Sequence, residues 1–184
     1  MSTGPNFQND TGKSFVNLTD GNYTVQDFSI SFASGGIQGV LDLVFAGKDK
    51  ITGSINADIL SGGGGNDTMH GMGDNDTLFG DYGNDKMFGD SGRDLFFGGF
   101  GNDRMEGGDQ SDTFRFAKGT GNDTVVDFDL KGRDHDFLEL DPSQHFTKVQ
   151  HRDNLVLDFG DGDTLTLLNV HKGDFDVHKY VHDL

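Results

Sequence analysis

The sequence predicts an all-β fold, in which seven nine-residue repeats coil into a right-handed stack capped by flanking strands and a hairpin. Three observations predict it. The chain repeats every nine residues from Gly53 to Arg115 without interruption. Each repeat begins with Gly and carries Asp at its sixth position. The eighth residue is always large and apolar. A fixed short period of this kind indicates a stack in which neighbouring repeats bury one continuous core.

The repeats read GSINADILS, GGGGNDTMH, GMGDNDTLF, GDYGNDKMF, GDSGRDLFF, GGFGNDRME and GGDQSDTFR. The first-position glycines are Gly53, Gly62, Gly71, Gly80, Gly89, Gly98 and Gly107. The sixth-position aspartates are Asp58, Asp67, Asp76, Asp85, Asp94, Asp103 and Asp112. The eighth-position residues are Leu60, Met69, Leu78, Met87, Phe96, Met105 and Phe114.

The spacing has a physical reason. Glycine permits positive φ, so the first six residues can form a tight turn whose carbonyls point toward one spot. The last three residues form a short strand whose middle side chain points inward. One repeat is then half a coil, and repeats n and n+2 stack with parallel strands. The stacking also brings their aspartate carboxylates together.

The acidic composition predicts that the chain binds a cation. The chain has 31 acidic against 14 basic residues, a formal net charge of −17, and only 33% apolar residues. Low hydrophobicity with high charge is typical of disordered chains, but 17 Phe argue against simple disorder. Paired carboxylates and carbonyls form oxygen-only sites of the kind that a hard cation such as Ca²⁺ prefers. The same charge disfavours nucleic acid and anionic membranes as partners.

Other classes of protein are disfavoured. The chain has no Cys, which excludes disulfides, thiolate metal sites and cysteine catalysis. Its first residues, MSTGPNFQNDTGKS, lack the basic and apolar regions of a Sec-type signal peptide. No window approaches the roughly 18 apolar residues of a transmembrane segment.

The repeats resemble those of the RTX (repeats-in-toxin, haemolysin-type calcium-binding) family, whose motif is GGxGxDxUx with U a large apolar residue. The resemblance implies a right-handed parallel β-roll with Ca²⁺ between stacked turns. In that family one turn offers the carbonyls of positions 2 and 4, the next offers those of positions 1 and 3, and both offer the sixth-position Asp.

Carried over to this chain, the resemblance implies five calcium sites. The first site comprises Ser54, Asn56 and Asp58 with Gly71, Gly73 and Asp76. The second comprises Gly63, Gly65 and Asp67 with Gly80, Tyr82 and Asp85. The third comprises Met72, Asp74 and Asp76 with Gly89, Ser91 and Asp94. The fourth comprises Asp81, Gly83 and Asp85 with Gly98, Phe100 and Asp103. The fifth comprises Asp90, Gly92 and Asp94 with Gly107, Asp109 and Asp112.

Two of these sites depart from the motif, and a sixth site extends the series. The first repeat departs most, and we expect its site to be weak; the last repeat, which contains Gln110, departs as well. The residues Gly119, Gly121 and Asp123 look like a further half-turn shifted by two residues. Asp123 is therefore a candidate for a sixth site with the Gly99–Asp103 turn, which offers Gly99, Gly101 and Asp103.

Three segments are expected. Residues 1–52 contain strands at Tyr23–Phe32 and Gly39–Phe45 and a mobile polar tail. Residues 53–115 form the roll. Residues 116–184 form a β cap with a secretion signal, as the resemblance implies. Within this cap, Asn154–Phe159 and Thr164–Asn169 read as a hairpin around a GDGD turn.

The two faces of the roll differ in their outward side chains. The odd-numbered repeats are more apolar outside, and Phe79 and Phe97 should stack because they lie two repeats apart. We expect a flanking strand or hairpin to cover this face. The alternative is a platform on which carbohydrate stacks.

The residues and the resemblance together predict a non-catalytic, calcium-responsive module. It would stay unfolded at low cytosolic Ca²⁺, pass a type I secretion exporter and fold outside a Gram-negative cell. One alternative is a polysaccharide-binding or adhesion module. Another is the accessory domain of a secreted enzyme of the mannuronan C5-epimerase, serralysin or lipase type, since the chain is too short for those catalytic domains and lacks their motifs.

Overall fold

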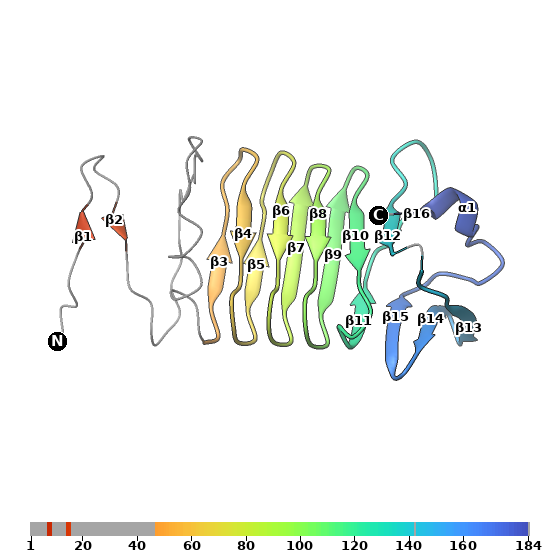
Figure 1. Ribbon diagram of the computed structural model, residues 1–184. Coiled ribbons are helices and arrows are strands. Elements are labelled where there is room, and N and C mark those ends of the chain that lie inside the picture. The colour runs from red at the N-terminus through yellow and green to blue at the C-terminus, as the bar shows by residue number, and fades with distance from the viewer. Residues whose placement is uncertain (1–6, 9–13, 16–46, 142, 184) are drawn as a thin grey trace.

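The computed structural model describes residues 7–8, 14–15, 47–141 and 143–183. In these ranges the chain is almost entirely β-structure, and its strands stand side by side along one axis (Figure 1). Near the N-terminus, β1 (Phe7–Gln8) pairs antiparallel with β2 (Ser14–Phe15). The strands expected at Tyr23–Phe32 and Gly39–Phe45 lie outside the described residues.

Two sheets form the walls of the roll, because successive repeats alternate between them. The six-stranded sheet has the order β16-β12-β10-β8-β6-β4, and the eight-stranded sheet has the order β13-β14-β15-β11-β9-β7-β5-β3. Odd repeats supply β4 (Ile59–Ser61), β6 (Thr77–Phe79), β8 (Leu95–Phe97) and β10 (Thr113–Phe116). Even repeats supply β5 (Thr68–His70), β7 (Lys86–Ser91) and β9 (Arg104–Asp109).

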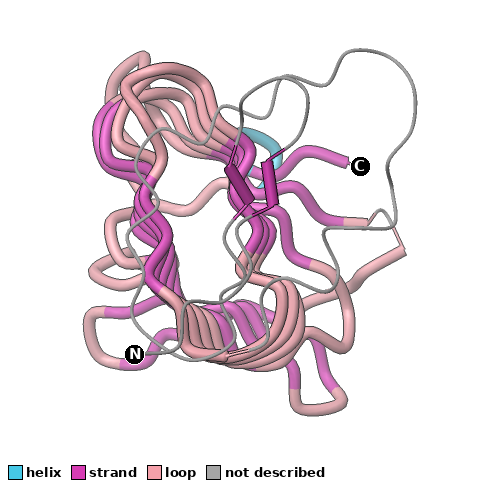
Figure 2. Tube along the Cα trace, turned by 90° about the vertical axis from the view of Figure 1, so that its left-hand side faces the viewer, coloured by secondary structure: helices cyan, strands magenta, loops and turns pink. Residues whose placement is uncertain are grey.

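The strands of repeats n and n+2 pair in parallel, as the repeat predicts. Leu60 lies opposite Leu78, and Met69 lies opposite Met87. Viewed along the axis, the successive coils superpose (Figure 2). The prediction of an all-β parallel roll is therefore confirmed.

The core is the row of eighth-position side chains that the two sheets enclose. Met69, Leu78, Met87 and Phe96 have no exposed surface, and Phe96 stacks on Phe114 with ring centroids 4.9 Å apart. Position 8 points inward because alternate side chains of a strand face opposite sides. The positions on either side of it are half-buried or exposed.

Both sheets continue beyond the predicted repeats. At one end, β3 (Lys50–Thr52) pairs with β5. At the other end, β11 (Asn122–Val125) pairs with β9, and β12 (Phe137–Leu140) pairs with β10. The roll therefore begins before the first predicted repeat, at residues 50–52.

The C-terminal cap extends both sheets edge to edge. The strands β13 (Thr147–His151), β14 (Asn154–Gly160) and β15 (Asp163–Leu167) form an antiparallel meander joined to β11. The predicted hairpin is therefore present, and β13 is an additional strand. After it, α1 (Val177–Tyr180) leads into β16 (Val181–Asp183), which pairs with β12. Tyr180 is buried, and its hydroxyl donates to the Leu130 carbonyl at 2.8 Å.

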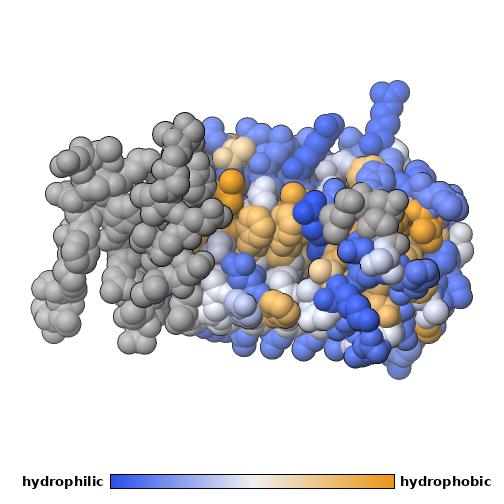
Figure 3. Space-filling view, in the orientation of Figure 1, coloured by the Kyte–Doolittle hydropathy of each residue, from blue (hydrophilic) through white to orange (hydrophobic). Residues whose placement is uncertain are grey.

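We expected a flanking strand or hairpin to cover the outer face of the six-stranded sheet. The described part of the C-terminal cap does not cover it, and the strands expected before the roll lie outside the described residues. An apolar patch on that face includes Ile59, 53% exposed, and the stacked rings of Phe79 and Phe97, 4.4 Å apart (Figure 3). The stack continues into Arg115, whose guanidinium lies 4.7 Å from the Phe97 centroid. Arg115 in turn pairs with Glu139. The C-terminal hairpin extends the other sheet because its backbone hydrogen bonds are satisfied by pairing with β11.

Candidate metal centre

The turns that connect the two sheets stack into two columns, one on each side of the roll. We define the even column as the turns of the even repeats, with residues 47–49 before them and 119–123 after them. The odd column consists of the turns of the odd repeats and ends at Asp136. The repeat places one buried aspartate at the end of every turn, immediately before the strand.

A ladder of carboxylates runs through each column. In the even column, the backbone N–H groups of four aspartates donate to the Oδ1 atoms of the next aspartates along the column at 2.7–2.9 Å. The members in order are Asp49, Asp67, Asp85, Asp103 and Asp123. The odd column has the same four bonds at 2.7–2.9 Å. Its members in order are Asp58, Asp76, Asp94, Asp112 and Asp136.

Within the described part of the chain, the second oxygen of most of these carboxylates has no hydrogen-bond partner. The Oδ2 atoms that are buried and accept no hydrogen bond belong to Asp49, Asp67, Asp76, Asp85, Asp94, Asp103 and Asp112. Burying a charged oxygen without a partner is costly, and native proteins normally satisfy such atoms with hydrogen bonds or metal ions. A row of buried carboxylate oxygens without hydrogen-bond partners therefore fits a row of bound cations.

The electrostatics of the ladders point the same way. Burial raises the pKa of Asp76 and Asp85 to about 7, and neighbouring carboxylates add to the rise. The pKa of Asp112 rises to about 8 for the same reasons, and so does that of Asp123. The protein alone thus disfavours the charged form of these groups, and a cation between them would restore it.

Backbone carbonyl oxygens lie beside the same unpartnered carboxylate oxygens. A side chain at Gly71 would meet Asp76 Oδ2 and would come within 2.9 Å of the Gly89 carbonyl oxygen. The first position must therefore be glycine, because one carboxylate oxygen and one carbonyl oxygen converge beside its Cα. Among the described residues, no group of three or more His, Asp or Glu side chains converges as a metal cluster. Ligands for an ion in these columns would therefore have to include main-chain oxygens.

The ladders place the predicted aspartates together and add residues that the sequence interpretation missed. Asp123 continues the even ladder, as the half-turn at Gly119 and Gly121 suggests. Asp49 and Asp136 were not predicted. Asp49 could have been found by extending the nine-residue register backward, because Ile51 then falls on the apolar eighth position. Asp136 follows Asp112 by 24 residues, so an insertion hides its register.

A further carboxylate closes each column. Asp163 accepts from the Gly119 and Gly121 amides at 2.7 and 3.3 Å at the end of the even column. Asp127 accepts from the Gly107 and Gly108 amides at 2.9 and 3.0 Å at the end of the odd column. Both satisfy N–H groups that a following turn would otherwise cover.

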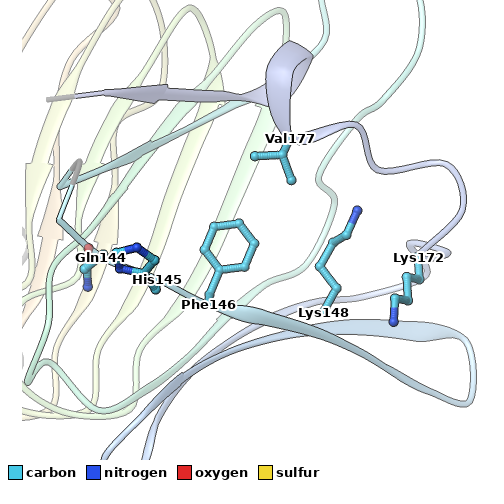
Figure 4. Close-up of a pocket in the computed structure, with 6 residues that line it drawn as sticks. All are labelled: Gln144, His145, Phe146, Lys148, Lys172 and Val177. Carbon is cyan, nitrogen blue, oxygen red and sulfur yellow. The ribbon is translucent and has the colours of Figure 1, made fainter.

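A concave region in the cap lacks comparable chemistry. One open pocket in the cap is lined by Gln144, His145, Phe146, Lys148, Lys172 and Val177 (Figure 4). Its Lys148 ammonium already donates to the Phe175 carbonyl at 2.9 Å. No helix in the described part of the chain is long and apolar enough to cross a membrane.

Stacked turns, in-register carboxylates and orphaned oxygens define a cation-binding β-roll. Comparison with known families identifies the class more closely. Residues 45–78 and 79–114 match the model of the RTX calcium-binding nonapeptide repeat. This segment of the chain carries calcium-binding repeats similar to those of that family, and the resemblance inferred from the sequence is confirmed.

Similar solved structures include an extracellular lipase and a subunit of a mannuronan C5-epimerase. The extracellular lipase LipA from Serratia marcescens is 18% identical with a TM-score of 0.41, and the match covers 90% of this chain and 43% of the lipase chain. The AlgE6R3 subunit of the mannuronan C5-epimerase from Azotobacter vinelandii is 22% identical with a TM-score of 0.47, and the match covers 82% of this chain and 86% of that one. The chain thus spans less than half the length of the lipase. No curated protein sequence matches it.

Proposed function

We propose that this protein is a non-catalytic module that folds when Ca²⁺ binds between its stacked turns. The observation that carries the proposal is the file of buried Oδ2 atoms without partners along both columns. The net charge of −17 opposes a compact chain, and the repeats place much of that charge inside it. Binding free energy then becomes folding free energy, because the unfolded chain has no preformed site.

Each ion would lie between the aspartates of successive turns in one column. The ligand sets that follow from the family motif supply two carboxylates and four carbonyls, the all-oxygen environment that Ca²⁺ prefers. The ladders support the five predicted pairs of turns and the sixth at Asp123. They also offer two further intervals, between Asp49 and Asp67 and between Asp112 and Asp136.

Folding would be coupled to export. Cytosolic Ca²⁺ is low, so the acidic chain would remain unfolded and able to pass a type I secretion exporter in a Gram-negative cell. Extracellular modules bind Ca²⁺ with affinities of roughly 10⁻⁴–10⁻³ M, so the chain would fold outside. Comparing secretion from a Gram-negative host with and without such an exporter tests this step. Equal release from both hosts would contradict it.

Circular dichroism tests the folding itself. The full chain should lack a β signal in a chelator and gain it at millimolar Ca²⁺. Mg²⁺ at the same concentration is the matched control, because it keeps its waters and demands near-ideal octahedral geometry. A spectrum that does not change when Ca²⁺ is added would overturn the proposal.

A further inference from the structure

The two columns differ in the backbone conformation of their turns. In the even column the fourth position is glycine at Gly65, Gly83 and Gly101, with φ of 132°, 132° and 141°. A Cβ at Gly83 would overlap the Gly65 carbonyl oxygen, so the close approach of these turns requires glycine there. The even turns therefore repeat one conformation.

The odd column does not repeat one conformation. Its fourth positions include Asp74 at φ 66°, Gly92 at 151° and Gln110 at 78°. Met72 and Asp90, at second positions, also hold φ of 85° and 68°. These left-handed values are unfavourable for residues with a Cβ, and most of all for a side chain without a local hydrogen bond such as Met. In the even column the non-glycine residue with this strain is Asp81, whose carboxylate accepts from Ser61 and Gly63.

Backbone hydrogen bonds join the even turns continuously. The amides of Gly65, Gly83 and Gly101 donate to the third-position carbonyls of the next even turns at 2.7–2.8 Å. Gly47 donates to Gly64 in the same way. Among the described residues, the odd column has one equivalent bond, from Gly92 to Asp109 at 3.2 Å. Its other backbone pairing of turns joins repeats 5 and 7 alone, where Asp90 pairs with Gly108 and Ser91 with Asp109 between β7 and β9.

Asparagine side chains at the fifth position add a second ladder to the even column. The Oδ1 atoms of Asn66, Asn84 and Asn102 accept the backbone N–H of the fifth residue two repeats later at 2.7–2.9 Å. Asn122 completes the ladder by accepting from the Thr164 hydroxyl in the cap at 2.8 Å. In the odd column one such bond, from the Arg93 amide to Asn75, occurs within the described chain.

From these differences we infer that the two columns are unequal calcium sites, and that the even column fills first while the odd column fills at a higher Ca²⁺ concentration. This inference rests on the proposed function. An ion binds more tightly where other hydrogen bonds form in the same turn as it folds, because these bonds offset part of the cost of ordering the ligands. The even turns are held by their backbone hydrogen bonds and by the asparagine ladder. The odd turns must instead adopt unfavourable φ angles to offer their carbonyls. Asn84 is thus a positioning residue that acts through the turn it orients.

Amide hydrogen exchange of the full chain at stepwise Ca²⁺ concentrations distinguishes the columns. We expect residues 80–85 to become protected at a lower concentration than residues 71–76. If Ca²⁺ protects neither column, the proposed function fails. If both columns become protected at the same concentration, the proposed function stands and the inequality is wrong.

Matched variants test the cause. Asn84→Ala should raise the half-protection concentration of the even turns about three- to tenfold, the range expected for one lost hydrogen bond. Asn84→Asp keeps an acceptor and should restore the wild-type midpoint. Asn75→Ala should shift the odd turns alone. The double variant Met72→Gly, Asp74→Gly should lower the odd midpoint. Unchanged midpoints in Asn84→Ala, in Asn75→Ala and in the double variant would overturn the inference.

Discussion

Neutralising one central aspartate should remove calcium binding on both of its sides. Asp85 lies in the middle of the even ladder, where its Oδ1 accepts the Asp67 N–H at 2.7 Å and its own N–H donates to Asp103 at 2.8 Å. Its Oδ2 is buried without a partner. The substitution Asp85→Asn keeps the size and the Oδ1 acceptor, removes the charge, and replaces Oδ2 with an amide nitrogen that cannot ligate Ca²⁺. The side chain borders two intervals of the ladder, so one substitution affects two proposed ions.

The magnitude follows from Coulomb's law. One carboxylate about 2.4 Å from Ca²⁺ contributes on the order of 10 kcal/mol at an effective dielectric constant of about 20, before desolvation is subtracted. Even a tenth of that value is close to the 1.4 kcal/mol that corresponds to a tenfold change in affinity, by the arithmetic of binding constants. We therefore expect at least a tenfold rise in the Ca²⁺ concentration needed for folding, and two fewer bound ions.

Isothermal titration calorimetry and circular dichroism measure the two quantities. Asp153→Asn is the matched control, because Asp153 is exposed in the turn between β13 and β14. In a chelator the sign reverses: Asp85→Asn should favour the compact state, because it removes one of three stacked negative charges. The reasoning is refuted if Asp85→Asn and Asp153→Asn bind the same number of ions and fold at the same Ca²⁺ concentration.

Three further predictions concern the core, the cap and pH. Phe96→Ala removes a fully buried ring stacked on Phe114 and should lower the free energy of unfolding in saturating Ca²⁺ by about 3–5 kcal/mol in urea titrations, with Phe96→Leu as the milder comparison. Tyr180→Phe loses the hydrogen bond to Leu130 and should cost about 1 kcal/mol, whereas no loss would mean that water replaces the bond. Burial raises the pKa of the column aspartates Asp67, Asp76 and Asp112 from 3.8 to about 6, 7 and 8. Because their folded-state pKa exceeds the unfolded one, their contribution to calcium-free stability should be fully present below about pH 4 and lost as the pH rises through 6 to 8. Circular dichroism in a chelator measures this trend, and the trend should be the opposite with Ca²⁺.

The nine-residue pattern by itself determined the architecture. Invariant Gly and Asp positions with an apolar eighth residue leave one way to bury the apolar row, with strands of repeats n and n+2 paired in parallel. Both the pairing of Leu60 with Leu78 and the burial of Met87 follow from this pattern alone. The sequence also contained the reason for the cation, since its repeat stacks like charges on one another.

Only the tertiary structure decided where the ladders end. Asp136 joins the odd ladder across an insertion that breaks the period, because hydrogen bonding to the Asp112 amide depends on proximity in space. It also decided that the C-terminal hairpin extends one sheet instead of covering the apolar patch at Phe79 and Phe97. Backbone pairing with β11 satisfies the polar groups of a free sheet edge, whereas covering the patch would leave that edge unpaired. The repeat pattern shows which residues recur along the chain. The end of the odd ladder and the position of the hairpin depend instead on which main-chain groups lack hydrogen-bond partners in the folded roll.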